Sequence, residues 1–272
     1  MPELPEVETV RRSLLKNVKG HKIIKVETYL DKLYSPTTKA EFIKSLTNQT
    51  INDVNRVSKW LIIELDDYDL LSHLRMEGKY NYVLQNTPRE KHDYIIFDLD
   101  NGYSLRYNDT RQFGKMILMP LNVGAKHPAI TKIGPEPWDT DETYLKEKLK
   151  NKRIAIKTAL LDQTILAGLG NIYVNEVLFL SKIKPTRPAN KLTKKELADI
   201  IKHSSEVMQK SIEAGGTTIH NFTSELGKPG AFQDQLLIHG KVDQPCPICK
   251  KAIHKEKVNG RGTYYCKNCQ KK

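Results

Sequence analysis

Apolar residues at the start of the chain follow the spacing of an amphipathic helix. Leu4, Val7, Val10 and Leu14 are three or four residues apart, which places them on one helical face. Pro2 and the three glutamates among the first eight residues suit a helix N-terminus, where proline is tolerated and the dipole attracts negative charge. The pattern therefore predicts an N-terminal helix with one buried face.

Short segments rich in β-branched and aromatic residues follow at strand-and-turn intervals. The Asn101-Gly102 pair between two of them is a strong signal for a tight hairpin. The sequence predicts a β-sandwich that carries the N-terminal helix, with strands at 23–29, 51–57, 60–65, 70–75, 79–84, 94–99, 103–107 and 115–119.

The pattern changes after residue 127, where prolines and glycines mark a linker at 128–137. Helical periodicity follows, and Thr193 with Glu196 forms a capping box for a long helix that Gly215-Gly216 ends. Residues 215–235 lack clear periodicity and predict a mobile loop. The helices are predicted at 141–149, 154–166, 172–180 and 193–214.

All four cysteines lie near the C-terminus, with the spacing C-x2-C-x16-C-x2-C. Two such knuckles can supply four thiolates to a tetrahedral ion, so the spacing predicts one structural Zn²⁺. Four thiolates leave no open position for a substrate. The alternative is a pair of disulfides, which a reducing cytosol disfavours. The predicted ligands are Cys246, Cys249, Cys266 and Cys269.

The apolar content of 39% is ordinary for a soluble protein, but the net charge is unusually high. The formal net charge is +12, and lysines crowd the C-terminal segment from Lys241 onward. Such a surplus indicates a polyanionic partner, and phosphates of nucleic acid are the natural one. No apolar run is long enough to cross a bilayer and no signal peptide opens the chain, so we expect a cytoplasmic protein without a membrane partner.

Pro2 offers chemistry that an internal proline does not have. Removal of Met1 would leave its nitrogen as a free secondary amine. With generic pKa values of about 7.8 for an α-amino group and about 10.4 for lysine, roughly 14% of such an amine is neutral at pH 7, against roughly 0.04% of a lysine. Its iminium product has no N–H to lose and stays cationic, so it acts as an electron sink. The structural alternative is a proline that only begins the helix.

Four motifs together resemble formamidopyrimidine-DNA glycosylases across nearly the whole chain. They are the opening MPELPEVET, SHLRMEG at 72–78, DTRQFG at 109–114 and AGLGNIY at 167–173, and the cysteine-rich C-terminus follows in the same order. The resemblance implies an α+β fold with four parts: an N-terminal catalytic β-sandwich domain at 1–127, the linker at 128–137, a helix-two-turns-helix domain at 138–238 with a lesion-covering loop near 215–235, and a zinc-finger β-hairpin at 239–272.

The resemblance implies a bifunctional enzyme that excises oxidised purines such as 8-oxoguanine and formamidopyrimidines, then cleaves the strand by β,δ-elimination. Pro2 would be the nucleophile and Glu3 the general acid or base. Glu6 would orient the amine and the N-terminus. Lys59 matches the family lysine that reaches the phosphate beside the lesion. The partner would be damaged double-stranded DNA, with no nucleotide cofactor, and we expect a monomer.

The resemblance also assigns DNA contacts. A base must leave the duplex to be reached, and the family fills the resulting hole with three side chains. Asn171 and Arg261 would grip phosphates, and His73 belongs to a motif that faces DNA. The residues that would fill the hole are Met76, Arg111 and Phe113.

Some positions depart from the family pattern. His220 and Asn221 stand where arginine and aspartate are expected, and His239 replaces a usual tyrosine. These departures leave the lesion preference open. Two other functions also remain as alternatives: an endonuclease VIII-like glycosylase for oxidised pyrimidines, whose family usually opens Pro-Glu-Gly-Pro, and a non-catalytic zinc-dependent DNA-binding protein, which the basic charge and the zinc finger would serve equally well.

Overall fold

The computed structural model describes residues 2–217 and 230–271, which form two compact units. The first unit contains residues 1–131 and the segment 214–231, and the second contains the remaining residues. Within the described residues, no helix is both long and apolar enough to cross a membrane. His220 and Asn221 lie outside the described residues.

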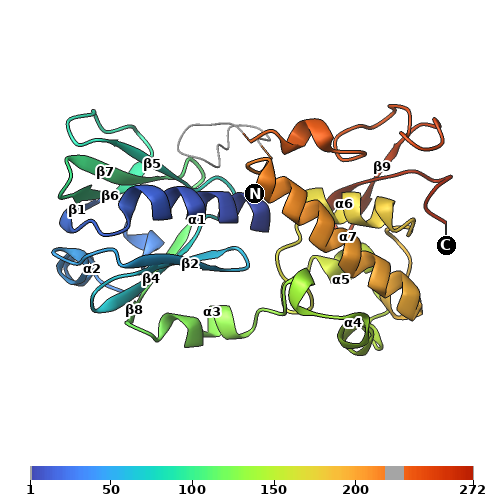
Figure 1. Cartoon of the computed structure of the whole chain (residues 1–272), viewed down its shortest axis with the longest axis horizontal. Coiled ribbons are helices and arrows are strands. Elements are labelled where there is room, and N and C mark those ends of the chain that lie inside the picture. Colours follow the sequence, from blue (N-terminus) through green and yellow to red (C-terminus); the bar gives the residue numbers. More distant parts are fainter. Residues whose placement is uncertain (1, 218–229, 272) are drawn as a thin grey trace. The chain divides into compact units, whose positions relative to one another are not determined.

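The first unit holds two antiparallel four-stranded sheets (Figure 1). The strand orders are β1-β6-β7-β5 and β2-β3-β4-β8. All eight strands lie where the sequence predicts them, to within three residues at their ends. Their bounds are β1 Ile23–Thr28, β2 Asp53–Val57, β3 Trp60–Glu64, β4 Tyr68–His73, β5 Lys79–Leu84, β6 Asp93–Leu99, β7 Tyr103–Asn108 and β8 Lys115–Pro120.

Helix α1 (Leu4–Val18) covers the core of this unit with the apolar face that its periodicity predicts. Val7, Val10 and Leu14 are at most 4% exposed and belong to the same hydrophobic cluster as residues of both sheets. The sequence analysis missed α2 (Lys39–Leu46), which is capped by Thr38, and the short α3 (Pro128–Thr131) inside the predicted linker.

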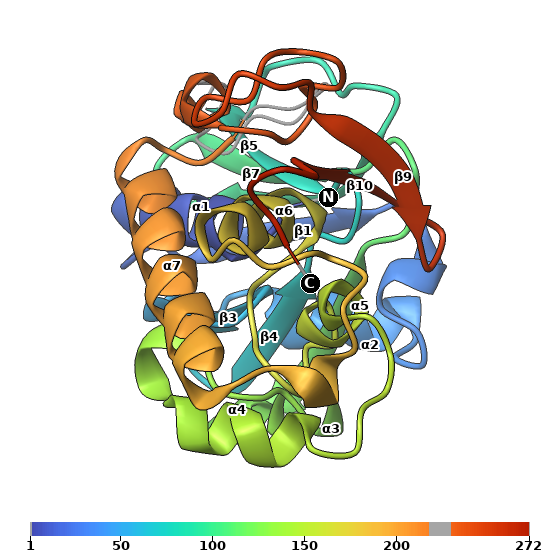
Figure 2. The same ribbon diagram turned by 90° about the vertical axis from the view of Figure 1, so that its right-hand side faces the viewer.

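The second unit is helical and ends in a β-hairpin (Figure 2). Its elements are α4 Glu142–Leu149, α5 Ile156–Leu160, α6 Asn171–Leu180, α7 Lys194–Glu213, β9 His254–Val258 and β10 Arg261–Tyr265. The predicted helix at 154–166 is wrong in length, because α5 ends at Leu160 and turns follow. The turn that replaces its second half is braced by Gln163, whose side-chain oxygen accepts a hydrogen bond from Gly168 N–H (3.0 Å).

The capping box of α7 is confirmed. Thr193 N–H donates to Glu196 Oε2 (2.8 Å), and Glu196 N–H donates to Thr193 Oγ1 (3.3 Å). The helix ends at Glu213, and Gly215 and Gly216 follow with φ of +76° and +80°, a left-handed conformation that ends helices readily at glycine.

Candidate functional site

The N-terminal residues form a buried, hydrogen-bonded start to α1. Pro2 is buried, and Glu3 and Glu6 are each 2% exposed. Glu3 is the N-cap residue, and its backbone N–H donates to Glu6 Oε2 (2.9 Å). The Glu6 carboxylate thus binds the backbone directly after Pro2. Its role in orienting the Pro2 amine stays a prediction.

The other oxygen of Glu6 holds a segment far away in the sequence. Glu6 Oε1 accepts hydrogen bonds from both the N–H and the Oγ1 of Thr217, each at 2.9 Å. The backbone packs tightly here, since a Cβ on Gly216 would lie 3.2 Å from Glu6 Cγ. One carboxylate therefore joins the chain start to the residue that precedes the segment 218–229.

Lys59 is placed by a tight turn. Val57 pairs with Trp60, so Ser58 and Lys59 form the two-residue loop between β2 and β3. Ser58 has a φ of +54°, and the two loop residues are only 1% and 4% exposed. A hairpin of this length demands a positive φ in its loop. The sequence identified Lys59 by resemblance alone and did not show that it lies in such a loop.

His73 lies at the end of β4, next to Trp60 of β3. The two rings meet edge to face, with centroids 4.8 Å apart. Burial, together with the nearby Arg75 and Lys59 cations, lowers the pKa of His73 to about 3, so the ring is neutral at physiological pH. Its Nδ1 accepts a hydrogen bond from Arg75 N–H (3.0 Å), which leaves Nε2 as the protonated donor.

Two loops carry the residues that the sequence assigns to the emptied base position. Met76 lies between β4 and β5 and is partly buried, whereas Arg111 and Phe113 lie exposed between β7 and β8. The guanidinium carbon of Arg111 is 5.0 Å from the centroid of the Phe113 ring, whose residue is 54% exposed. The hydroxyl of Thr110 donates to Glu77, so the structure brings the two loops together.

Tyr107 of β7 lies beneath both loops and explains their glycines. A Cβ at Gly78 would lie 2.2 Å from the Tyr107 hydroxyl, and a Cβ at Gly114 would lie 1.8 Å from it. Asp109 completes the second loop, because its carboxylate accepts hydrogen bonds from Arg111 N–H (3.1 Å) and Gly114 N–H (2.7 Å). The loops that carry Met76, Arg111 and Phe113 are therefore packed closely against Tyr107, and the second is also held by Asp109.

In the second unit, Asn171 begins α6 directly after a glycine turn. Gly168 has a φ of +92°, and Gly170 is the N-cap residue of the helix. Such a helix start can offer backbone N–H groups to an anion. The Asn171 side chain donates through Nδ2 to the carbonyl oxygen of Gly262 (3.1 Å), next to Arg261. The structure thus brings together two residues that the sequence assigns to phosphates.

Lys157 reinforces this junction and was missed by the sequence analysis. Its side chain is fully buried, and Nζ donates to the Gly262 carbonyl oxygen and to Thr263 Oγ1, both at 2.8 Å. The available signal was a single charged residue inside the apolar run 154–161. Buried lysines are rare unless they are paired with acceptors.

His239 and Glu176 connect α6 to the segment before the zinc finger. Glu176 accepts hydrogen bonds from the N–H groups of Leu237 (2.7 Å), Ile238 (3.0 Å) and His239 (2.7 Å). Asn175 Nδ2 lies 2.8 Å from His239 Nδ1. Burial and the Lys157 cation lower the pKa of His239 to about 4, so the histidine that replaces the usual tyrosine is neutral.

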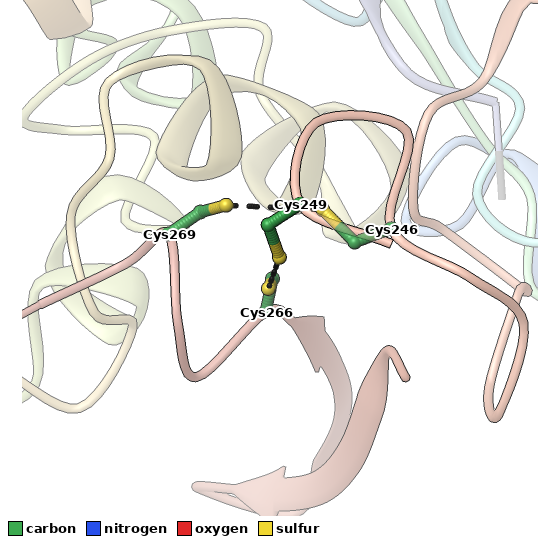
Figure 3. Close-up of side chains that lie close together, drawn as sticks. All are labelled: Cys246, Cys249, Cys266 and Cys269. Atoms are coloured by element: carbon green, nitrogen blue, oxygen red, sulfur yellow. Dashed lines mark hydrogen bonds between the residues drawn. The ribbon is translucent and has the colours of Figure 1, made fainter. Parts of the chain in front are cut away.

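The four cysteine side chains converge on one point (Figure 3). Their sulfur atoms lie within 4.8 Å of one another, and the described cysteines are free thiols. The Cys246–Cys269 and Cys249–Cys266 sulfur distances are 3.8 and 3.4 Å, too long for disulfides. Zinc–sulfur bonds of about 2.3 Å in a tetrahedron put sulfur atoms roughly 3.8 Å apart, so the site fits one structural zinc ion.

Arg261 stands at the tip of the zinc-finger hairpin. Asn259 and Gly260 form its two-residue turn, with φ of +46° and +73°. Positive φ at both positions is the type I′ geometry that matches the strand twist. Arg261 follows directly and is exposed.

Three family models match the chain. They describe the formamidopyrimidine-DNA glycosylase N-terminal domain over residues 1–116, the formamidopyrimidine-DNA glycosylase H2TH domain over residues 133–223, and a zinc finger found in FPG and IleRS over residues 243–272.

Similar proteins agree over the full length. The formamidopyrimidine-DNA glycosylase of Bacillus licheniformis is 43% identical, with 100% of each chain covered. Two solved structures of the Lactococcus lactis enzyme each cover 100% of both chains. One is bound to DNA that contains N7-benzyl-Fapy-dG, with 42% identity and a TM-score of 0.93. The other is bound to DNA that contains an abasic site, with 43% identity and a TM-score of 0.94. The chain belongs to the formamidopyrimidine-DNA glycosylase family.

Proposed function

We propose that this chain is a bifunctional DNA glycosylase and AP lyase that removes oxidised purines from duplex DNA. The observation that carries this proposal is the full-length similarity to relatives solved with Fapy-dG-type and abasic DNA. The start of α1 supports it, because Pro2, Glu3 and Glu6 are all buried there and Glu6 accepts a hydrogen bond from Glu3 N–H.

In the proposed reaction, the Pro2 nitrogen of the processed chain attacks C1′ of the damaged nucleotide. The C1′–N bond forms as the glycosidic bond breaks and the base leaves with its electron pair. Glu3 passes the proton of the attacking amine to the sugar ring oxygen, and the ring opens to an iminium ion whose nitrogen carries no hydrogen. The expelled base takes a proton from water. The iminium acidifies the adjacent sugar protons, so that the 3′ and 5′ phosphates leave in turn and Pro2 is released by hydrolysis.

The other residues would bind and hold the DNA. Four residues would contact phosphates: Lys59, His73, Asn171 and Arg261. The neutral His73 ring would donate a hydrogen bond through its Nε2–H group. The extruded base leaves a gap, which Met76, Arg111 and Phe113 would fill. Zinc would hold the hairpin that carries Arg261 and takes no part in the chemistry.

We also infer that the protein works as a cytoplasmic monomer. The sequence contains neither a heptad repeat nor a symmetric motif that would indicate a dimer. We retain the four parts at 1–127, 128–137, 138–238 and 239–272 as functional divisions, with the lesion-covering role assigned to 215–235.

Borohydride trapping tests the proposed reaction. Wild-type protein should form a covalent adduct on a duplex with 8-oxoguanine opposite cytosine, and Pro2→Gly should lose strand cleavage by at least about 100-fold. Pro5→Ala is the matched control, since its nitrogen is an internal amide and trapping should persist. Failure of the wild type to form an adduct would favour the non-catalytic DNA-binding protein.

Oxidised pyrimidines are the second candidate substrates. One solved Lactococcus lactis relative, with 42% identity and a TM-score of 0.93, is described in complex with DNA that contains an oxidised pyrimidine. Excision of thymine glycol opposite adenine should therefore be measured beside 8-oxoguanine. A clear preference for thymine glycol would contradict the purine assignment.

A further inference from the structure

Glu8 is the centre of a charge cluster that the proposed reaction does not use. This α1 residue is 7% exposed and lies one turn after the residues at the chain start. Its Oε1 accepts hydrogen bonds from Arg11 Nη2 (2.9 Å) and Arg12 Nε (2.8 Å). Its Oε2 accepts hydrogen bonds from Arg11 Nε (2.9 Å) and Arg56 Nε (3.0 Å).

Arg56 links α1 to the hairpin formed by β2 and β3. While its Nε binds Glu8, its Nη1 donates to the backbone carbonyl oxygen of Ser58 at 2.8 Å. Ser58 is the residue directly before Lys59. A planar guanidinium can satisfy two acceptors in fixed directions at once, whereas a lysine ammonium is a single point on a flexible chain. The link therefore depends on arginine at this position.

The Ser58 turn needs such a support. A serine with a φ of +54° occupies a conformation that disfavours residues with a Cβ, and it persists only where surrounding contacts fix it. The turn is also buried, with Ser58 at 1% and Lys59 at 4% exposure. The Arg56 hydrogen bond is one contact that holds the turn in this state.

We propose that Glu8 and Arg56 are positioning residues that fix Lys59 relative to α1, the helix that begins directly after Pro2 and Glu3. This inference rests on the proposed function. The carboxylate is suited to the task because hydrogen bonds from the three arginines outweigh burial and lower the pKa of Glu8 to about 2. It therefore stays ionised throughout the pH range in which the enzyme would act.

A double-mutant cycle tests whether Arg56 acts through Lys59. We expect Arg56→Ala to slow single-turnover excision of 8-oxoguanine by about tenfold, and Lys59→Ala to slow it more. The double variant should be no slower than Lys59→Ala alone, because a misplaced lysine and a missing one have the same consequence. Rate losses that multiply in the double variant would overturn the proposal, since a general structural role predicts independent effects.

Arg12→Ala is the matched control. Its side chain donates to the same carboxylate but is 55% exposed and, among the described residues, makes no hydrogen bond to the β2–β3 hairpin. Removal of Arg12 should change the excision rate by less than about twofold. An equal loss in Arg12→Ala and Arg56→Ala would show that only the charge of the cluster matters, and this would also overturn the proposal.

Arg56→Lys keeps the test decisive if the alanine variant fails to fold. Lysine retains the charge but cannot reach Glu8 and Ser58 together, so excision should slow by about fivefold while the thermal midpoint stays close to wild type. An unchanged rate in Arg56→Lys would contradict the inference. Failure of the proposed function would look different, because wild-type protein itself would then form no trapped adduct.

Discussion

The start of α1 and the zinc finger both carry residues assigned to DNA, yet different forces hold them in place. At the start of α1, buried carboxylates accept hydrogen bonds from groups distant in sequence, such as Thr217 and Arg56. In the zinc finger, four thiolates from a stretch of 24 residues converge on one point. The first region depends on the packing of the whole unit, whereas the second depends mainly on one ion, with a few hydrogen bonds from Lys157 and Asn171. The two should therefore respond to different perturbations.

Removal of zinc should have the largest effect, and this effect should be confined to the zinc finger. Structural zinc contributes about 10–16 kcal/mol in zinc-finger peptides, so a chelator or Cys249→Ser should unfold the hairpin and misplace Arg261. We expect duplex affinity to fall by about 100-fold, or roughly 2.7 kcal/mol. Fluorescence anisotropy measures the affinity. Near-ultraviolet circular dichroism reports the packing of the aromatic residues, most of which lie in the first unit.

Restored binding after zinc is added back would be the control for the chelator. Unchanged affinity in Cys249→Ser would contradict the role given to the zinc finger. Loss of the near-ultraviolet signal of the first unit would show that the two regions are not independently held.

The substitution Glu6→Gln should disrupt the start of α1 and leave the zinc finger intact. A glutamine has one acceptor oxygen, so its NH₂ group would face an N–H donor at either Glu3 or Thr217. The buried donor left without an acceptor costs about 1–3 kcal/mol. We expect excision to slow by at least about tenfold with nearly unchanged DNA affinity, measured by single-turnover kinetics and anisotropy.

Thr217→Val separates the two bonds of Glu6. It removes the hydroxyl donor but keeps the backbone N–H bond and the bond to Glu3. A smaller loss of rate than in Glu6→Gln is expected, and an equal loss would mean that the Thr217 hydroxyl alone explains the phenotype.

Acidification should have the smallest effect, and this effect should be on the stability that Glu8 contributes near the start of α1. The folded pKa of Glu8 is about 2, below its ordinary value of 4.5. Its stabilising contribution is therefore complete above about pH 4.5 and is lost as the pH falls from there toward 2. After allowance for screening, the loss is about 1–2 kcal/mol. Urea unfolding of the zinc-free protein at pH 5 and pH 3 measures it.

Glu8→Gln should be less stable than wild type at pH 5 and should lose less stability between pH 5 and pH 3. The zinc-free protein is required, because protonation of the thiolates releases the metal over an overlapping pH range. The same slope in both proteins would show that Glu8 does not contribute to acid denaturation.

Elements with a local signal were predictable from the sequence. Helix α1 follows from its periodicity, the eight strands from their β-branched and aromatic residues, and Thr193 with Glu196 caps α7 as their spacing indicates. The helix at 154–166 was predicted too long because apolar residues continue after Leu160. Those residues are buried in turns and not on a helical face, a difference that periodicity over so short a window does not reveal.

The candidate site divides in the same way. The zinc ligands are set by local sequence, because two knuckles of fixed spacing suffice to surround an ion. Local sequence also brings Glu8 within reach of Arg11 and Arg12, which lie three and four residues away on one helix. Three further contacts require the folded chain: Arg56 joins Glu8, Lys157 and Asn171 share the Gly262 carbonyl oxygen, and Glu6 binds Thr217. A helix or a knuckle fixes distances over a few residues, but partners 48 to 211 residues apart meet only when the core has closed between them.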